Sequence, residues 1–342
     1  MVKNDLVSIT IPAYNKPDYL EKCLDSIINQ TYRPIEIIIS DDNSPIDLTP
    51  IVERIKLNTN IRFVFERQKL NLRPYWNHWV NYRKAEGRYL IFMPHDDWFI
   101  CANYIQSAID ILNSKQNCFI AIANSFLEGT EQKFMNYDLS EWTFIDGIKF
   151  NTENLYTNLH PAYSAVVVDN HKLKSLGYED LIISKADSFK MKIEPDESFI
   201  MISMLASVGD VAVTGKIVSV RGNPPDSYSK SKFWRKKGSV GVAIPYIKLM
   251  QYYQGKNNNI LSRFYKKLVL TKYNVTSINK AIFDYFDWKP EILFLLIGSW
   301  IINKSAPIVS FVNMVMRIGY RIATRQKSLK HYLSSLLNKA NL

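Results

Sequence analysis

The sequence predicts an α/β protein built on a doubly wound, mostly parallel sheet and followed by a carboxy-terminal helical appendage. In the first 125 residues, short apolar runs alternate with amphipathic patterns of helical period. Repeated units of this length favour parallel strands joined by right-handed crossovers. Polar clusters directly follow three of the apolar runs. Because parallel sheets bind ligands at the carboxyl ends of their strands, these clusters predict a functional site at that edge.

The individual elements follow from local patterns. The β-branched run 35–40 is typical of a strand covered on both faces. Pro17 suits the first turn of a helix, and Gly87 separates a helix from the strand that follows it. The expected strands of this half are 6–12, 35–40, 61–66, 88–93 and 119–123, and the expected helices are 18–29, 47–57, 74–86 and 103–112.

Beyond residue 124 the pattern loosens. The expected elements are a strand at 164–169, a helix at 196–207, short strands at 211–213 and 217–220, a loop at 221–231, and helices at 240–253, 258–272, 275–286, 291–302 and 308–337. We therefore predict a first domain over 1–231, with halves 1–125 and 126–231, and a basic helical region over 232–342.

Positive charge is concentrated in the last third. Residues 230–342 contain 20 Lys/Arg and 3 Asp/Glu, whereas residues 1–229 contain 23 and 29. Such a segment suits nucleic acid or an anionic membrane, and its many Trp, Phe, Leu and Ile favour the membrane over nucleic acid; a solvated basic bundle is the alternative. Basic residues at four-residue spacing share one helix face, as in a helix lying on an anionic leaflet: Arg317, Arg321 and Arg325. The apolar stretch 292–302 is shorter than a spanning helix requires.

Three widely spaced cysteines form neither a disulfide framework nor a zinc motif. The first apolar run is too short for a signal peptide. We therefore expect a cytoplasmic protein that is peripheral to the inner face of the cell membrane.

Adjacent carboxylates follow two of the strands. Asp96 and Asp97 repel one another, and burying them is costly unless a cation compensates. A hard divalent ion would do so and keep positions open for substrate phosphates; a solvated turn that caps the next helix is the alternative. Asp41 and Asp42 could accept hydrogen bonds from a uracil ring and from ribose, while Ser44 caps the next helix.

These motifs together resemble the opening of the inverting family 2 glycosyltransferases, which have the GT-A fold. The resemblance is strong over 5–125 and weak over 160–231. It is carried, in chain order, by Val7-Ser8-Ile9-Thr10-Ile11-Pro12-Ala13-Tyr14-Asn15-Lys16, Leu20 to Asn29 with Gln30-Thr31-Tyr32, Ile35–Ser40 with Asp41-Asp42-Asn43-Ser44, Asn71 to Asn77, Ala85-Glu86-Gly87-Arg88-Tyr89 and His95-Asp96-Asp97.

The resemblance implies a donor site and a metal. The residues that would hold the nucleotide-sugar donor are Pro12, Ala13 and Tyr14 in the nucleoside pocket, Asp42 on the base, Asn77, and Asp96 on ribose or sugar hydroxyls. Asp97 would ligate Mn²⁺ or Mg²⁺ bound to the donor diphosphate.

Inverting transfer also needs a carboxylate that takes the proton of the acceptor hydroxyl. The segment Glu194-Pro195-Asp196-Glu197 resembles the family's Glu-Asp segment, so Asp196 is the predicted base and Glu197 the next candidate. Acidic residues at a helix N-terminus are also favoured by the helix dipole, which is the alternative explanation.

The sequence departs from the family at two places. Arg73 stands where the family often has Gly, and it either brings a positive charge to the diphosphate or lies on the surface. Pro94 stands where an Asp-x-Asp-Asp motif would begin. The loop at 221–229 resembles one that commonly orders over the donor, with a passive linker as the alternative.

The expected function is transfer of a sugar from a nucleotide-diphosphate donor, usually a UDP-sugar, to a glycan or lipid-linked acceptor in bacterial surface polysaccharide biosynthesis. One alternative is an inactive membrane-associated scaffold or sugar-nucleotide-binding protein. Another, a nucleotidyltransferase, should carry a Gly-rich phosphate loop where Pro12-Ala13-Tyr14-Asn15 stands.

Overall fold

The computed structural model describes residues 5–135, 139–157, 161–183, 197–227, 230 and 246–272. The chain divides into two compact units. The first comprises residues 1–150, 160–189 and 194–238, and the second comprises residues 151–159, 190–193 and 239–342. The predicted boundary at 231 falls beside residues 231–245, which lie outside the described parts, so it remains a prediction.

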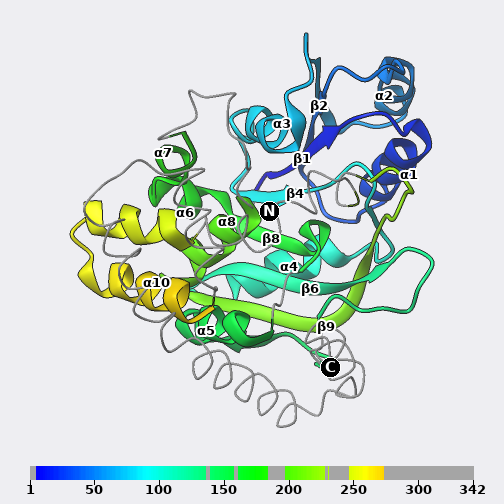
Figure 1. Cartoon of the computed structure of the whole chain (residues 1–342). Helices are drawn as coiled ribbons and strands as arrows, with labels where there is room; N and C mark the ends of the chain where they lie inside the picture. The colour runs from blue at the N-terminus through cyan, green and yellow to red at the C-terminus, as the bar shows by residue number, and fades with distance from the viewer. Residues whose placement is uncertain are drawn as a thin grey trace, which may run out of the picture. The chain divides into compact units, whose positions relative to one another are not determined.

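One sheet organises the first unit, with strand order β3-β2-β1-β4-β8-β6-β9-β5 and with β7 also paired to β9 (Figure 1). β1 to β4 are parallel to one another, and β6 is parallel to β9. The remaining pairs are antiparallel. The strands are β1 (Val7–Ala13), β2 (Ile35–Asp41), β3 (Arg62–Arg67), β4 (Tyr89–Phe92), β5 (Trp98–Phe99), β6 (Cys118–Leu127), β7 (Thr143–Ile145), β8 (Val166–Asp169) and β9 (Asp210–Arg221).

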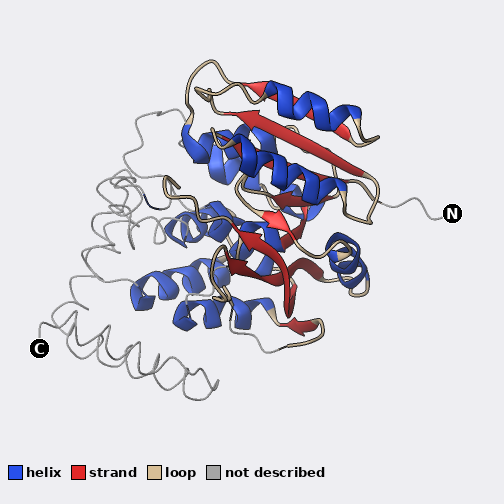
Figure 2. Ribbon diagram, turned by 90° about the vertical axis from the view of Figure 1, so that its right-hand side faces the viewer, coloured by secondary structure: helices blue, strands red, loops and turns tan. Residues whose placement is uncertain are grey.

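Helices cover both faces of this sheet, which confirms the predicted α/β class (Figure 2). The described helices of the first unit are α1 (Pro17–Ile28), α2 (Thr49–Leu57), α3 (Arg73–Tyr82), α4 (Tyr104–Asn113), α6 (Asn170–Ser175), α7 (Tyr178–Ile183) and α8 (Glu197–Ala206), with a 3-10 turn, η1, at Tyr163–Ala165. α5 (Gly147–Thr157) begins in the first unit, and α10 (Asn259–Lys272) belongs to the second.

The two faces of β1 and β2 differ in chemistry because side chains alternate along a strand. Odd-numbered residues such as Val7, Ile9 and Ile37 belong to the main apolar core with residues of α1, α2 and α4. Even-numbered positions are partly polar: the buried Ser8 hydroxyl donates to Glu36 Oε1 over 2.5 Å. Burial on both faces holds the strand ends rigidly, and those ends carry the polar clusters.

Several elements differ from the sequence prediction. β5 and β7 were not expected, because strands of two or three residues carry no recognisable alternation and exist through pairing with β9. The two strands expected at 211–213 and 217–220 form one continuous strand, β9, whose pairing with β6 contains register shifts. α3 ends at Tyr82, four residues earlier than predicted.

The described part of the second unit contains helical residues 246–255 and α10. Tyr253 and Tyr265 stack with ring centroids 5.7 Å apart, and Tyr246 lies 6.1 Å from Tyr265. These rings join the two helices. Among the helices that the structure describes, none combines the length and apolar character needed to span a bilayer. The predicted helices at 275–286, 291–302 and 308–337 lie outside the described residues.

Candidate active site

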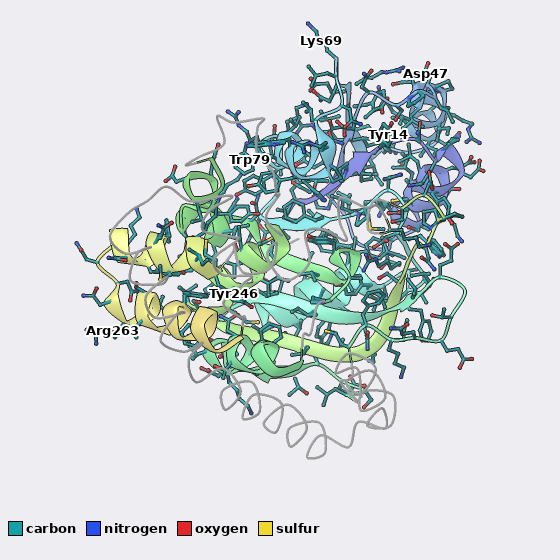
Figure 3. The ribbon with its side chains drawn as sticks, in the orientation of Figure 1. Tyr14, Asp47, Lys69, Trp79, Tyr246 and Arg263 are labelled. Atoms are coloured by element: carbon teal, nitrogen blue, oxygen red, sulfur yellow. The ribbon has the colours of Figure 1, made fainter. Side chains whose placement is uncertain are left out.

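The carboxyl ends of β1 and β2 are tied together by hydrogen bonds. The Asp42 N–H donates to the Ala13 carbonyl over 2.8 Å, and the Asn15 N–H donates to Ser44 Oγ over 2.8 Å. Asn15 has a φ of 53°, a left-handed conformation that Asn adopts more readily than most residues. The two loops thus form one preformed edge. Tyr14 projects from it and is 40% exposed (Figure 3).

Ser44 belongs to this edge rather than to a helix cap. Its backbone N–H donates to Asp41 Oδ1 over 3.0 Å, and its hydroxyl also hydrogen-bonds that oxygen. α2 begins only at Thr49. The predicted capping role of Ser44 is therefore wrong, because its hydroxyl is already used within the loop.

The Asp42 carboxylate holds the turn that leads into α3. Asp42 Oδ1 accepts the Leu72 N–H over 2.5 Å, and Oδ2 accepts the Arg73 N–H over 3.0 Å. Arg73 has a φ of 69°, a left-handed conformation that costs a residue other than Gly about 1–2 kcal/mol. These hydrogen bonds explain how Arg is accommodated where the family often has Gly. Asp42 is 3% exposed, and its contact with a base remains a prediction.

Asn77 supports the same edge from within the protein. Its side chain is 1% exposed, and its Nδ2 donates to the Ser40 carbonyl over 2.9 Å. The neighbouring His78 and Trp76 are buried, as expected for packing residues, and the His78 ring contacts Phe92 at 5.2 Å. In this structure Asn77 positions the end of β2, and direct contact with a donor remains a prediction.

The two adjacent carboxylates after β4 have different surroundings. Asp97 is 1% exposed: Ser164 Oγ donates to its Oδ2 over 2.8 Å, and the Gly222 N–H donates to its Oδ1 over 3.2 Å. Burial, and then the nearby Asp96 charge, raise the pKa of Asp97 to about 8. Asp96 itself is partly exposed. Of the pair, Asp96 is the carboxylate that a ligand in solution can reach.

His95 connects this segment to β1. Its Nδ1 lies 3.1 Å from the Pro12 carbonyl. Burial lowers the pKa of His95, which favours a neutral ring whose Nδ1–H donates to that carbonyl. The contact fixes the His95-Asp96 segment beside the predicted nucleoside pocket.

The loop after β9 closes onto these carboxylates. Besides the bond from Gly222 to Asp97, the Asn223 N–H donates to Glu128 Oε2 over 2.9 Å. Tyr19 donates to the same Glu128 oxygen over 2.8 Å, and Lys16 pairs with Asp226 at 3.6 Å. Residues 221–227, the closing loop, therefore contact the site directly and are not a passive linker.

Several residues of this site were not predicted from the sequence, notably Lys16, Glu128 and Ser164. Lys16 lies in the first motif, so its position at the edge could have been inferred. Neither Glu128 nor Ser164 belongs to a recognisable motif, and only the folded chain brings them to the closing loop and to Asp97. Asp196 lies outside the described residues, and Glu197 begins α8.

The sequence predicts Asp97 as the metal ligand and Asp96 as a contact to ribose or sugar hydroxyls, and the structure allows the fit of a divalent metal to be compared at the two carboxylates. Within the described residues, no group of three His, Cys, Asp or Glu side chains forms a complete metal site. Mg²⁺ and similar ions are commonly held by one or two carboxylates together with substrate phosphates and waters. The partly exposed Asp96 can serve in that way, whereas both oxygens of Asp97 already accept protein hydrogen bonds.

A doubly wound sheet whose carboxyl edge carries a carboxylate pair and a closing loop defines a protein of the GT-A type. The sequence model of glycosyl transferase family 2 matches residues 8–165, so the chain is similar to that family over this segment. A crystal structure of S. aureus TarS (residues 1–349) with UDP-GlcNAc shares the fold: the TM-score is 0.55 at 16% identity, covering 86% of this chain and 79% of that one.

Curated relatives are similar over part of the chain. The glycosyltransferase GlyA of Streptococcus pneumoniae is 28% identical over 159 residues, 46% of this chain and 22% of the relative. The GalNAc(5)-diNAcBac-PP-undecaprenol beta-1,3-glucosyltransferase of Campylobacter jejuni is 30% identical over 111 residues, 32% of this chain and 34% of the relative. The UDP-Glc:alpha-D-GlcNAc-diphosphoundecaprenol beta-1,3-glucosyltransferase WfaP of Escherichia coli is 31% identical over 124 residues, 36% of this chain and 47% of the relative. The chain thus spans less than half the length of each.

Proposed function

We propose that this protein is an inverting glycosyltransferase that moves a sugar from a UDP-sugar to a glycan or lipid-linked acceptor, in the assembly of a bacterial surface polysaccharide. The observation that carries the proposal is the partly exposed Asp96, held beside the β1 edge by His95 and next to the closing loop. The match to the glycosyl transferase family 2 model supports transfer. The two relatives whose names specify undecaprenol-linked acceptors support a lipid-linked acceptor.

In this proposal, each residue at the carboxyl edge of the sheet has a distinct role in binding the donor. Pro12, Ala13 and the exposed Tyr14 line the nucleoside pocket. The Asp42 carboxylate accepts the Leu72 and Arg73 N–H groups at the start of α3 and also accepts a hydrogen bond from the base. Asn77 holds the end of β2 in place by its hydrogen bond to the Ser40 carbonyl.

The chemistry then needs charge stabilisation and a base. A divalent cation, Mn²⁺ or Mg²⁺, bound at Asp96 would supply charge stabilisation for the leaving diphosphate. Asp196 takes the proton of the acceptor hydroxyl as its oxygen attacks the anomeric carbon from the side opposite the diphosphate.

The metal assignment has a direct test by thermal denaturation. UDP should raise the melting temperature more with Mn²⁺ or Mg²⁺ than with a chelator, because a ligand that binds only the folded state stabilises it. Asp96→Asn keeps the side-chain shape but removes the charge, so this metal-dependent difference should disappear. Asp97→Asn is the matched control and should retain it.

The reverse pattern would assign the metal to Asp97, as the sequence analysis did. Transfer that continues undiminished in excess chelator would show that no divalent metal is needed. Binding of UDP-sugars without their consumption, across a panel of lipid-linked acceptors, would favour the inactive sugar-nucleotide-binding protein.

The protein is further proposed to act in the cytoplasm at the inner face of the cell membrane. The support is the excess of basic residues over 230–342. Each basic side chain near an anionic leaflet contributes about 1 kcal/mol, and salt screens this attraction. We expect co-sedimentation with anionic vesicles, much less with neutral vesicles, and partial release at high salt.

A variant with three fewer positive charges tests the same electrostatic attraction. Changing Arg317, Arg321 and Arg325 to Gln should reduce vesicle binding while nucleotide binding is unchanged. Equal binding to neutral and anionic vesicles would refute electrostatic attachment. Resistance to alkaline carbonate extraction would instead indicate insertion through 292–316, which lies outside the described residues.

A further inference from the structure

An open cleft lies in the first unit, on the outer side of α4, with a volume of about 360 Å³. This is within the range of about 300–1,000 Å³ that small-ligand sites occupy. The cleft is lined by Asn103, Gln106, Ser107, Asp110, Ile111 and Trp142.

This cleft is separate from the candidate active site. None of its lining residues belongs to the loops that carry Tyr14, Asp42 or Asp96. Trp142 directly precedes β7, which pairs with Val211–Val213 near the start of β9. The closing loop leaves the other end of β9, at Arg221. Trp142 therefore lies beside the first half of β9, whereas the closing loop begins at the last residue of that strand.

The polar residues of the cleft share one helix face. Positions 106, 107 and 110 are spaced by three and four residues, which places them side by side on α4, and Asn103 is the residue that directly precedes this helix. Gln106 Nε2 donates to Asp110 Oδ1 over 2.8 Å. These four side chains thus offer amide, hydroxyl and carboxylate groups to a ligand. Asp110 is the one charged residue among the six that line the cleft.

Trp142 provides a fixed aromatic wall. Its Nε1 donates to Ser107 Oγ over 2.7 Å, and part of the ring packs on the main core. Since the indole N–H is already bonded, the ring offers a ligand mainly apolar contact. An aromatic ring held in this way loses little conformational entropy when a ligand packs against it.

We propose that this cleft binds a neutral saccharide, a short chain of pyranose rings. A pyranose presents C–H bonds on one face, which pack on an aromatic ring, and hydroxyls at its edge, which pair with amides and carboxylates. No lining residue is basic and Asp110 is acidic, so the cleft offers no positive charge to a phosphate or nucleotide. The site would hold a glycan at a second place, independently of whether transfer occurs at the sheet edge.

Saturation-transfer NMR on the full chain tests the proposal, with chitotriose, cellotriose and maltotriose as probes. At least one probe should receive saturation, and saturating UDP should leave that signal unchanged. Because each lost hydrogen bond weakens binding about fivefold, the variant Asn103→Ala with Gln106→Ala should weaken it at least that much. Gln116→Ala removes an exposed amide that does not line the cleft and should bind as the unchanged protein does.

Three results would overturn the proposal. The first is no saturation transfer to any of the three probes. The second is displacement of the probe by UDP, which would place it in the donor site. The third is equal affinity in the double variant and in Gln116→Ala. None of these measurements depends on catalysis, so a failure here is distinct from a failure of the proposed transferase activity.

Discussion

The Asp196→Asn variant is expected to bind the donor normally and to lose transfer by about 10²–10⁴-fold, the usual contribution of a positioned general base. The amide keeps the size of the side chain but cannot accept the proton of the acceptor hydroxyl. Asp196 directly precedes α8, which begins at Glu197. Steady-state kinetics would show the loss in kcat, and the melting temperature with UDP would remain unchanged.

Glu197→Gln is the matched control, one residue further along the chain. If Asp196 is the base, this variant should retain most of its turnover. A loss in Asp196→Asn that is confined to donor affinity would assign Asp196 to binding and make Glu197 the next candidate. Full turnover in both variants would exclude this segment as the source of the base.

The second large effect is expected from Gly222→Ala in the closing loop. A Cβ at this position would lie 1.9 Å from the Asp96 carbonyl oxygen, a backbone atom that cannot move aside as a side chain can. The loop must therefore shift, and the hydrogen bond from Gly222 to Asp97 must lengthen or break. Because a displacement of about 1 Å near an active site can cost about 10²-fold in rate, we expect kcat/KM to fall by about that factor.

Gly255→Ala is the control for Gly222→Ala, since among the described residues nothing beyond its chain neighbours and its own helix backbone lies within 4 Å of a Cβ built there. It introduces the same methyl group without a clash and should leave kcat/KM unchanged. Thermal denaturation of both variants would separate a local shift of the loop from global unfolding. Unchanged transfer in Gly222→Ala, with the protein folded, would show that the loop position does not matter for the reaction.

The first half of the fold was predictable because its signals are local. β1 and β2 are apolar runs buried on both faces, and α1 and α4 show the helical period. By contrast, β5 and β7 are too short for any pattern, and the polar segment around Gly215 hides the continuity of β9. These elements depend on partners far away in the chain, which a local pattern cannot reveal.

The properties of the candidate site also fall into those that local sequence predicts and those that depend on long-range contacts. The sequence by itself determined that Asp41, Asp42, Asp96 and Asp97 lie at or just after the carboxyl ends of parallel strands, because strand ends and acidic residues can both be recognised from local sequence. Only the tertiary structure decided which carboxylates are free. Ser164 and Gly222, 67 and 125 residues further along the chain, bury Asp97, whereas Asp96 stays partly exposed. Adjacent residues differ in this way because burial and hydrogen bonding depend on long-range contacts, which the amino-acid pattern around the pair does not contain.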